Sequence, residues 1–461
     1  MKRYEAYDSF LDIWVNEIPA HWEAHKMKYL FHERSEKGYP DELLLVASQN
    51  MGVVPKKVYG NRTVEAQKDL HLLKLVRVGD FVISLRSFQG GLEYAYYQGI
   101  ISPAYTVLTP HEPITAGYFR YLAKSKLFIG LLTLCVTGIR EGQNIDYEKL
   151  RNHSLPVPPR TEQDQIVRYL DWQVSKINRL IAAKRKEIAL LKEQKQRKIT
   201  EVVVHGLKPN VPHKDTGIAW IGSIPAHWHC VALKRCATVK SGITLGKQYP
   251  VGTNLVSVPY LRVANVQDGF VNIETVTNLN VTPEEAAQYR LPRGCVLMTE
   301  GGDRDKLGRG CVWNGEIENC IHQNHIFAVT VNDKLLLNKW LEYVSACDIG
   351  RVYFDVTAIK TTNLACTNAS KVMAFPIPLP PRDEQECIIN ELNRITSRFN
   401  DARESLEKQI EYLQELRILL ISDVVTGQID VRSIKVPDNE YINNEITEEE
   451  FEEESENNEE E

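Results

Sequence analysis

An internal duplication constrains the fold of this 461-residue chain more than any other feature of its sequence. The pentapeptide IPAHW occurs at Ile18–Trp22 and again at Ile224–Trp228, an offset of 206 residues. A second matched pair, PPRTEQ and PPRDEQ, begins at Pro158 and at Pro380, an offset of 222 residues. The second copy therefore contains about sixteen more residues between its two motifs. A repeat of this length is too long for a solenoid, so it predicts a duplicated pair of domains.

The segments after each PPR motif carry the pattern of long, paired helices. Apolar or small residues recur every three or four positions, and the residues between them are mostly charged or amide residues. This spacing is typical of a coiled-coil seam. It predicts two helices of about 40 residues that pair in an antiparallel or parallel coiled coil; two separate surface helices are the alternative. The predicted seam positions are Ile166, Leu170, Val174, Ile177, Ile181, Ile188, Leu191, Ile199 and Val202 in the first helix, and Ile388, Leu392, Ile395, Phe399, Ala402, Leu406, Ile410, Leu413, Leu416, Leu420 and Val424 in the second.

The segments before each PPR motif differ from these helices. They consist of short β-rich runs broken by Gly and Pro, with helical stretches near the end of each copy, which indicates mixed α+β domains. The predicted fold class is therefore α+β, with two globular domains separated by two long helices in a pseudo-two-fold repeat. The predicted limits are residues 1–157 for the first domain, 158–207 for the first long helix, 208–379 for the second domain, 380–428 for the second long helix and 429–461 for a disordered tail.

The charge of the chain is unevenly distributed. The formal net charge is −6, but the segment from Pro437 onward holds 13 of the 61 Asp and Glu residues and no Lys or Arg. Such acidic runs are normally solvated and disordered. The rest of the chain is mildly basic, which permits nucleic-acid binding without requiring it. The sequence has no run of eighteen apolar residues and no apolar signal core, and its nine cysteines are scattered. We therefore expect a cytoplasmic protein with reduced thiols and no contact with a membrane.

Three features match catalytic or ligand-binding motifs only in part. Ser241–Gln248 lacks the glycine spacing of a phosphate-binding P-loop and the Ser or Thr that holds its metal ion. Ser102–Tyr105 lacks the first residue and the second Pro of the aromatic motif of amino-methyltransferases. Four Cys and His residues could in principle hold zinc, but they lack the close ligand pairs of a zinc finger. These four residues are Cys311, Cys320, His322 and His325. We therefore predict a chain without catalytic residues, a bound cofactor or a bound metal.

The duplicated IPAHW motifs, the duplicated PPR helices and the two divergent α+β domains resemble one family in combination. From about Asp8 to Gly427 the chain is similar to the specificity subunits of type I restriction-modification enzymes. The resemblance implies that each α+β domain is a target recognition domain, which reads one half of a bipartite, asymmetric site in double-stranded DNA. It implies that the two helices form an antiparallel coiled coil, which sets the spacing between the half-sites.

The resemblance also implies partners and cofactors. Two modification subunits, which bind S-adenosylmethionine and methylate adenine, would dock on the helices. Two restriction subunits, which are ATP- and Mg²⁺-dependent translocases, would complete the nuclease. The chain itself would be non-catalytic and would bind none of these cofactors. Two alternatives remain open: a coiled-coil assembly protein that does not touch DNA, and an orphan DNA methyltransferase or nuclease.

Polar residues in the loops of both domains are the candidates for contact with DNA. Sequence is read in the major groove by Arg, Lys, Gln and Asn side chains that bond to base edges. The candidates in the first domain are Arg86, Gln89, Arg140, Gln143 and Asn144, and those in the second are Arg304, Lys306, Arg309, Gln323, Asn324, Lys360 and Asn363. Any one of them could instead be an ordinary surface residue, Asn144 could cap a helix, and Thr299–Gly310 could be a purely structural hairpin.

Overall fold

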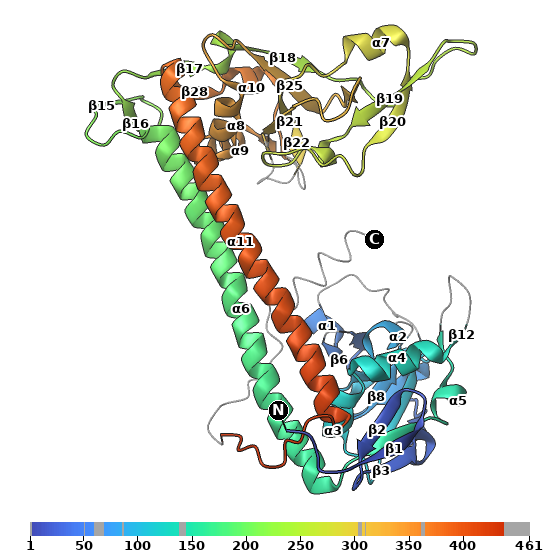
Figure 1. Ribbon diagram of the computed structural model, residues 1–461. Helices are drawn as coiled ribbons and strands as arrows, with labels where there is room; N and C mark the ends of the chain where they lie inside the picture. Colours follow the sequence, from blue (N-terminus) through green and yellow to red (C-terminus); the bar gives the residue numbers. More distant parts are fainter. Residues whose placement is uncertain are drawn as a thin grey trace. The chain divides into compact units, whose positions relative to one another are not determined.

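The computed structural model describes residues 2–49, 51–59, 69–84, 87–137, 144–302, 307–308, 310–360 and 365–437. The chain forms two compact units. Unit 1 combines residues 1–186 with the residues from 406 onward, whereas unit 2 is continuous from 187 to 405. Figure 1 shows both units, with labels on the helices and on many of the strands.

A four-stranded antiparallel sheet in the order β4-β11-β8-β9 forms the centre of unit 1. Two helices, α3 and α4, begin at Thr115 and Ser125, whose hydroxyls accept hydrogen bonds from amides of the first turn. Their apolar residues pack on the sheet, where Phe31, Phe81 and Phe119 form one buried aromatic cluster. These elements are β4 (Phe31–Arg34), β8 (Phe81–Ile83), β9 (Glu93–Tyr94), β11 (Thr106–Pro110), α3 (Ala116–Leu122) and α4 (Lys126–Leu134).

Unit 2 repeats this arrangement. Its central sheet has the order β18-β25-β21-β23, so each strand corresponds in chain order to a strand of unit 1. The helices α8 and α9 again follow the strand that lies second in the sheet, and Trp340, Phe354 and Phe375 fill the core between them. The elements are β18 (Ala237–Ser241), β21 (Val296–Thr299), β23 (Gly310–Val312), β25 (Ile326–Val331), α8 (Asn338–Ala346) and α9 (Asp348–Thr357). The predicted α+β class with an internal repeat is confirmed.

Smaller sheets with the same pairing accompany both central sheets. In unit 1 these are β1 (Tyr7–Asp12) with β2 (Val15–Pro19), β3 (Glu23–Lys26) with β14 (Ser154–Val157), and β12 (Val136–Thr137) with β13 (Asn144–Ile145). In unit 2 they are β15 (His213–Asp215) with β16 (Ser223–Pro225), β17 (His229–Ala232) with β28 (Pro376–Leu379), and β26 (Ile359–Lys360) with β27 (Ala365–Cys366), which also pairs with β22 (Gly301–Gly302).

The units differ in the small sheets inserted between the strands of the central sheet. Unit 1 has two pairs of strands there and unit 2 has one three-stranded sheet, and each insertion includes a short helix. The elements of unit 1 are β5 (Leu45–Ser48), β6 (Gly52–Pro55), α1 (Lys56–Tyr59), β7 (Lys74–Val76) and β10 (Gly99–Ile101); those of unit 2 are β19 (Val256–Leu261), β20 (Thr277–Val281), α7 (Pro283–Gln288) and β24 (Ile321–His322). Three further short helices are α2 (Ser87–Gly90), α5 (Tyr147–Leu150) and α10 (Ala369–Ala374).

Two long helices, α6 (Arg160–His205) and α11 (Arg382–Val425), follow the PPR motifs. In unit 1 the first part of α6 packs on the last part of α11, and Arg417 Nη1 donates to Asn178 Oδ1 at 2.7 Å. In unit 2 the last part of α6 packs on the first part of α11, and Lys195 Nζ donates to Asn400 Oδ1 at 3.1 Å. The helices therefore pair in antiparallel orientation within each unit. No helix of the described residues is long and apolar enough to span a membrane.

The predicted seam is correct at all but one position. Every predicted seam residue is buried or half-buried except Leu416, which is 51% exposed. A straight α-helix has 3.6 residues per turn, so a pattern with a period of 3.5 drifts away from the contact line. Leu416 therefore lies outside the contact line, whereas Leu413 and Leu420 remain partly or fully buried.

The PPR motif and the IPAHW motif meet at the start of each long helix. In unit 1, Glu162 accepts a hydrogen bond from Trp22 Nε1 at 3.1 Å and lies 2.7 Å from His21 Nε2. In unit 2, Glu384 lies 2.8 Å from His227 Nε2. The two motifs recur together because each glutamate fixes the IPAHW turn against the first turn of its helix.

The glutamine after each of these glutamates joins three segments. Gln163 accepts a hydrogen bond from the amide of Thr115 and donates to the carbonyls of Pro113 and Pro158, all at 2.9 Å. Gln385 makes the same three kinds of bond in unit 2, to the amide of Leu337 and the carbonyls of Leu335 and Pro380, also at 2.9 Å. Both side chains are completely buried. This shared amide bridge holds the long helix to the loop before α3 or α8.

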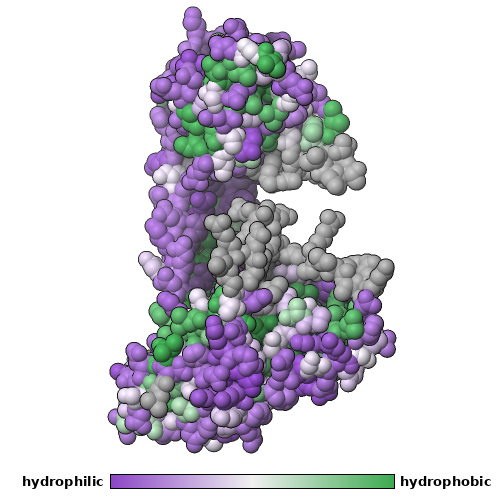
Figure 2. Space-filling view, turned by 90° about the vertical axis from the view of Figure 1, so that its right-hand side faces the viewer, coloured by the Kyte–Doolittle hydropathy of each residue, from purple (hydrophilic) through white to green (hydrophobic). Residues whose placement is uncertain are grey.

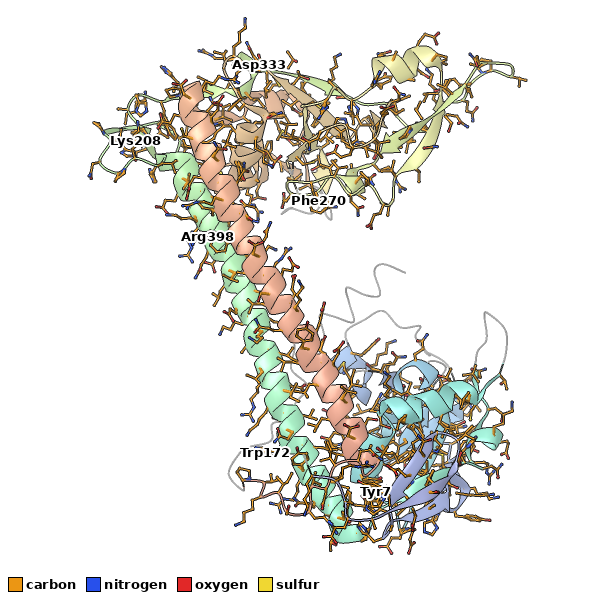
Figure 3. All side chains as sticks on the ribbon, viewed as in Figure 1. Tyr7, Trp172, Lys208, Phe270, Asp333 and Arg398 are labelled. Carbon is orange, nitrogen blue, oxygen red and sulfur yellow. The ribbon has the colours of Figure 1, made fainter. Side chains whose placement is uncertain are left out.

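The residues after α11 complete the core of unit 1. Gly427 has a φ of 76° and turns the chain toward the N-terminal strands, where its carbonyl accepts a hydrogen bond from the hydroxyl of Tyr7 at 2.8 Å. Tyr7 is labelled in Figure 3. Val431 is fully buried in the same core, and the amide of Asp430 donates to the carbonyl of Lys2. In unit 2, Gly206, with a φ of 72°, makes the corresponding turn after α6.

Candidate nucleic-acid interface

The two candidate loops of unit 1 lie beside each other. Gln89 is exposed on α2, which follows the central strand β8, and Asn144 is exposed on β13. The helix α2 contacts β13, so the sheet and α4 bring together two loops that are far apart in the sequence. The Gln89 Oε1 atom lies 3.5 Å from Gln49 Nε2. Arg86, Arg140 and Gln143 lie outside the described residues.

The corresponding loops of unit 2 are both connected to one small sheet. The chain enters the first loop from β22 and the second from β26, and both strands pair with β27. The sheet thus places Gly301–Gly302 and Ile359–Lys360 on opposite sides of β27. The side chain of Lys360 and the residues Arg304, Lys306, Arg309 and Asn363 lie outside the part of the chain that the structure describes.

Gln323 and Asn324 follow β24 in unit 2 and are both half-buried. Gln323 Oε1 accepts a hydrogen bond from the amide of Val263 at 3.3 Å, so part of its bonding capacity serves the fold. Asn324 Nδ2 lies 3.5 Å from Nε2 of the neighbouring His325. The other ring nitrogen of His325 lies 2.5 Å from Glu300 at the base of the first loop. This contact joins the two segments, and no motif in the sequence indicates it.

Phe270 is a surface residue that sequence reasoning missed. It lies on a tight turn of unit 2, is 59% exposed and is labelled in Figure 3. The turn is held by the hydrogen bond from the Gln267 amide to the Phe270 carbonyl and by the ion pair of Asp268 with Arg351 at 3.6 Å. The Gly269 amide also donates to the carbonyl of Gly310, where the first candidate loop ends. The Asp-Gly pair before Phe270 was the available turn signal.

Cys311, Cys320 and His322 lie in the core of unit 2. Among the described residues, no group of three or more His, Cys, Asp or Glu residues could hold a metal ion. Burial raises the pKa of the Cys311 and Cys320 thiols to about 12 and lowers the pKa of His322 to about 4, so all three are neutral core residues. Ser241–Gln248 forms the end of β18, a single bridge and a turn, whereas a P-loop leads directly into a helix.

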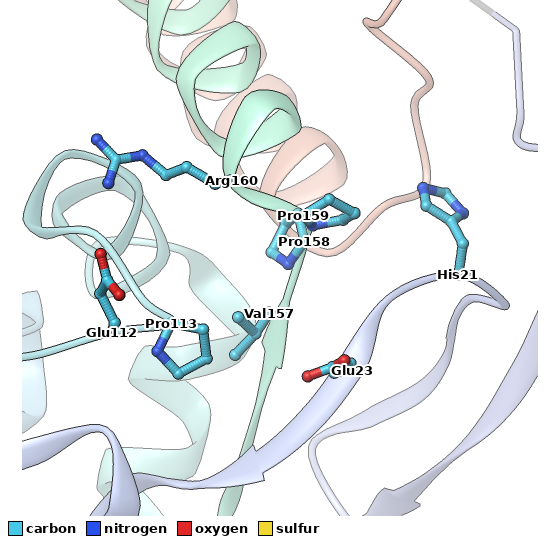
Figure 4. Close-up of a pocket in the computed structure, with 8 residues that line it drawn as sticks. All are labelled: His21, Glu23, Glu112, Pro113, Val157, Pro158, Pro159 and Arg160. Atoms are coloured by element: carbon cyan, nitrogen blue, oxygen red, sulfur yellow. The ribbon is translucent and has the colours of Figure 1, made fainter.

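A pocket of about 300 Å³ lies at the start of α6 in unit 1 (Figure 4). Its charged lining residues are His21, Glu23, Glu112 and Arg160. The side chains of Glu23 and Arg160 are 72% and 64% exposed, so water screens their charges strongly. His21 is already paired with Glu162. The pocket is the surface junction of the IPAHW and PPR motifs and does not assemble a catalytic group.

The chain is similar to known proteins both in sequence and in fold. The chain is 24% identical over 218 residues to a protein of Methanocaldococcus jannaschii named "Putative type I restriction enzyme MjaX specificity subunit", covering 47% of this chain and 49% of that protein. It is 23% identical over 303 residues to the "Type I restriction enzyme MjaVIII specificity subunit" of the same organism, covering 63% and 65%. No family model matches the chain.

These comparisons confirm the family resemblance predicted from the sequence. The chain spans about half the length of the first specificity subunit and just under two thirds of the second. A solved structure described as "Structural basis underlying complex assembly and conformational transition of the type I R-M system" contains a chain that matches 89% of this one and 99% of its own length. The TM-score is 0.64 at 16% sequence identity, which shows that the two chains share a fold.

Proposed function

We propose that this chain is the sequence-specific DNA-binding specificity subunit of a type I restriction-modification complex. One observation carries the proposal: two units with the same central sheet and the same amide bridge present different loops at corresponding places. The loops between β8 and β9 and between β12 and β13 correspond to those between β21 and β23 and between β26 and β27. A duplicated frame with divergent loops suits a reader of two different half-sites.

Each unit would read its half-site through these loops. Arg, Lys, Gln and Asn side chains distinguish base pairs by the donors and acceptors of the major groove, and phosphate contacts set the register. Gln89 and Asn144 in unit 1, and Gln323 and Asn324 in unit 2, are the exposed or half-buried candidates among the described residues. We propose the remaining sequence candidates, Arg86, Arg140, Gln143, Arg304, Lys306, Arg309, Lys360 and Asn363, for the same role.

The paired helices would set the spacing between the half-sites. Half-sites separated by a fixed number of base pairs need a rigid connection between their readers. Continuous helices of 46 and 44 residues, with a buried seam in each unit, suit that role. We also propose the domain limits given by the sequence, with residues 1–157 and 208–379 as the two recognition domains.

A stripe on α11 suits the docking of a modification subunit. Tyr412, Leu416 and Leu419 are 67%, 51% and 53% exposed and are spaced at four and three residues, so they lie on one face of the helix. Figure 2 shows mostly hydrophilic residues on the visible part of the helices. An apolar helix face commonly binds a groove in a partner protein. S-adenosylmethionine, ATP and Mg²⁺ would be bound by the modification and restriction subunits, and this chain would be non-catalytic.

The proposal is tested by mapping adenine methylation in cells that keep the modification subunit, with and without this chain. We expect one bipartite motif to lose methylation when the chain is absent. A methylation pattern that does not depend on the chain would contradict the proposal. The matched test of the docking stripe is Leu416→Glu against Glu415→Gln, an exposed neighbour on the same helix. Only the first should weaken co-purification with the modification subunit.

A further inference from the structure

The side chain of Glu93 is completely buried in unit 1. It lies on β9 and pairs with Val82 on the central strand β8. A carboxyl group in such a place is destabilising unless it is well bonded, because it loses its hydration. Burial raises the pKa of Glu93 to about 7, although the charge of Lys124 opposes this shift. A buried acid of this kind calls for an explanation beyond packing.

The carboxyl group holds the two ends of a short turn. The hydroxyl of Ser87 donates to Glu93 Oε2 at 2.7 Å, and the hydroxyl of Ser84 donates to Glu93 Oε1 at 3.3 Å. The amide of Ser84 also donates to the hydroxyl of Ser87 at 2.9 Å. Ser84 directly follows β8 and Ser87 begins α2, so one side chain joins the end of the strand to the start of the helix.

Lys124 holds the far end of α2. Its Nζ atom donates to the carbonyl of Gly90 at 2.8 Å and to the carbonyl of Gln49 at 2.9 Å. Gly91 then passes so close to the carbonyl of Ala123 that a Cβ atom there would lie 2.1 Å from the oxygen. The segment from Ser84 to Gly91 is therefore fixed at both ends. Gln89 is exposed between these two points.

Unit 2 shows that the shared fold does not require this carboxyl group. Glu93 pairs with Val82 on β8, and Cys311 pairs with Leu297 on β21, the corresponding strand. Cys311 therefore occupies the place of Glu93 in unit 2, and it is a fully buried, neutral thiol. The acid belongs to unit 1 alone, next to loops that differ between the units.

We propose that Glu93 is a positioning residue for DNA recognition by unit 1. It holds Ser84 and α2, through the hydroxyls of Ser84 and Ser87, in the positions that present Gln89 to a base edge. The inference rests on the proposed function, and it assigns Glu93 to the specificity of one half-site only. A residue that merely filled the core of unit 1 would lower the methylation rate on all duplexes alike, without changing the discrimination between correct and altered base pairs.

The test uses the complex of the full chain with its modification subunit. Methylation rates are measured on a duplex with the correct site and on duplexes with one base pair changed in either half-site. The variants are Glu93→Cys, which places the residue of unit 2 in unit 1, and Glu93→Gln, whose amide oxygen still accepts one hydrogen bond. Cys311→Ala is the matched control at the corresponding place in unit 2.

We expect Glu93→Cys to reduce discrimination at one half-site by about tenfold or more, which is the lower range for one base contact. Glu93→Gln should have a smaller effect at the same half-site, and Cys311→Ala should leave that half-site unchanged. Equal losses at both half-sites, or unchanged discrimination, would overturn the inference. If Glu93→Cys does not fold, Ser87→Ala removes the same bond without removing the acid, and it should give the same one-sided loss.

A parent complex that discriminates at neither half-site would refute the proposed function itself. A parent complex that discriminates at both, together with variants that behave like it, would refute only the role of Glu93.

Discussion

Unit 1 and unit 2 are most alike where they hold the long helices and least alike where their loops project. Both have the same order of central strands, and Gln163 and Gln385 make the same three hydrogen bonds. In contrast, the additional sheets differ in number of strands, and Glu93 corresponds to Cys311. The two units therefore share the contacts that hold the central sheet and the long helix in place, whereas the positions that would face a ligand differ between them.

The strongest test of this shared frame is removal of the amide bridge. Gln163→Ala and Gln385→Ala each leave one amide and two carbonyls without their partner in a buried place. We expect each change to destabilise its own unit by about 3–5 kcal/mol, because each unsatisfied buried group costs about 1–3 kcal/mol. Hydrogen exchange, measured on peptides of each unit, should show matched losses. Gln194→Ala, at an exposed position of α6, is the control. A large loss of protection for only one of the two variants would show that the two amide bridges are not equivalent.

The glycines after the two long helices test whether the two units tolerate a side chain equally well at corresponding turns. A Cβ atom at Gly427 would lie 2.3 Å from Cδ of Pro19, whereas one at Gly206 would lie 3.0 Å from Cζ2 of Trp228. Both have a positive φ, which costs Ala about 1–2 kcal/mol. Overpacking adds about 1–3 kcal/mol more at Gly427. Gly427→Ala should therefore lower the thermal midpoint of unit 1 more than Gly206→Ala lowers that of unit 2. Equal shifts would show that Pro19 moves aside.

Replacement of the tryptophans in the two IPAHW motifs should give a smaller difference in stability between the units. Trp22 Nε1 donates to Glu162, whereas Trp228 Nε1 has no hydrogen-bond partner among the described residues. Replacement by Phe removes the same volume from both cores, but only Trp22→Phe removes a hydrogen bond to a charged group. We expect Trp22→Phe to cost about 1–2 kcal/mol more than Trp228→Phe, measured by denaturant unfolding of each variant. The reverse order would contradict the hydrogen bond between Trp22 and Glu162.

The last prediction concerns pH and Glu93. The folded chain holds a proton on Glu93 up to a pKa of about 7, whereas an unfolded chain releases it near 4.5. Stability from this group is therefore full below pH 4.5 and is lost as pH rises through 7. Each pH unit within that window removes at most about 1.4 kcal/mol. The difference in thermal midpoint between the parent and Glu93→Gln should shift against the parent from pH 5 to pH 7 and then level off. A constant difference would show that Glu93 titrates normally.

The frame could be predicted from the sequence because its signals are periodic or repeated. Heptad spacing located both long helices, and the repeated PPR and IPAHW motifs marked the same junction twice. The bonds behind these motifs could not be predicted, because Gln163 meets Thr115 only after the chain has folded. Leu416 was misplaced for a related reason, since its exposure depends on the local phase of two helices.

The candidate site was less predictable. Residue type indicated which side chains can bond to bases, but it did not show which are already engaged with the protein, as Gln323 is with Val263. Nor did it single out Glu93, because one acid in a β-rich segment looks like any surface residue. The register of β8 with β9 determines its burial, and that register depends on contacts between distant segments.

The division of unit 1 between the two ends of the chain has a consequence for synthesis on the ribosome. Unit 2 is continuous, so all of its residues are available once position 405 has been made. Unit 1 begins first, but Val424, Val425 and Val431 belong to its core and are added last. The nascent N-terminal segment must therefore wait, incompletely packed, until the rest of the chain has emerged. A premature stop before Val424 would damage the first domain made, and leave the second with its core intact.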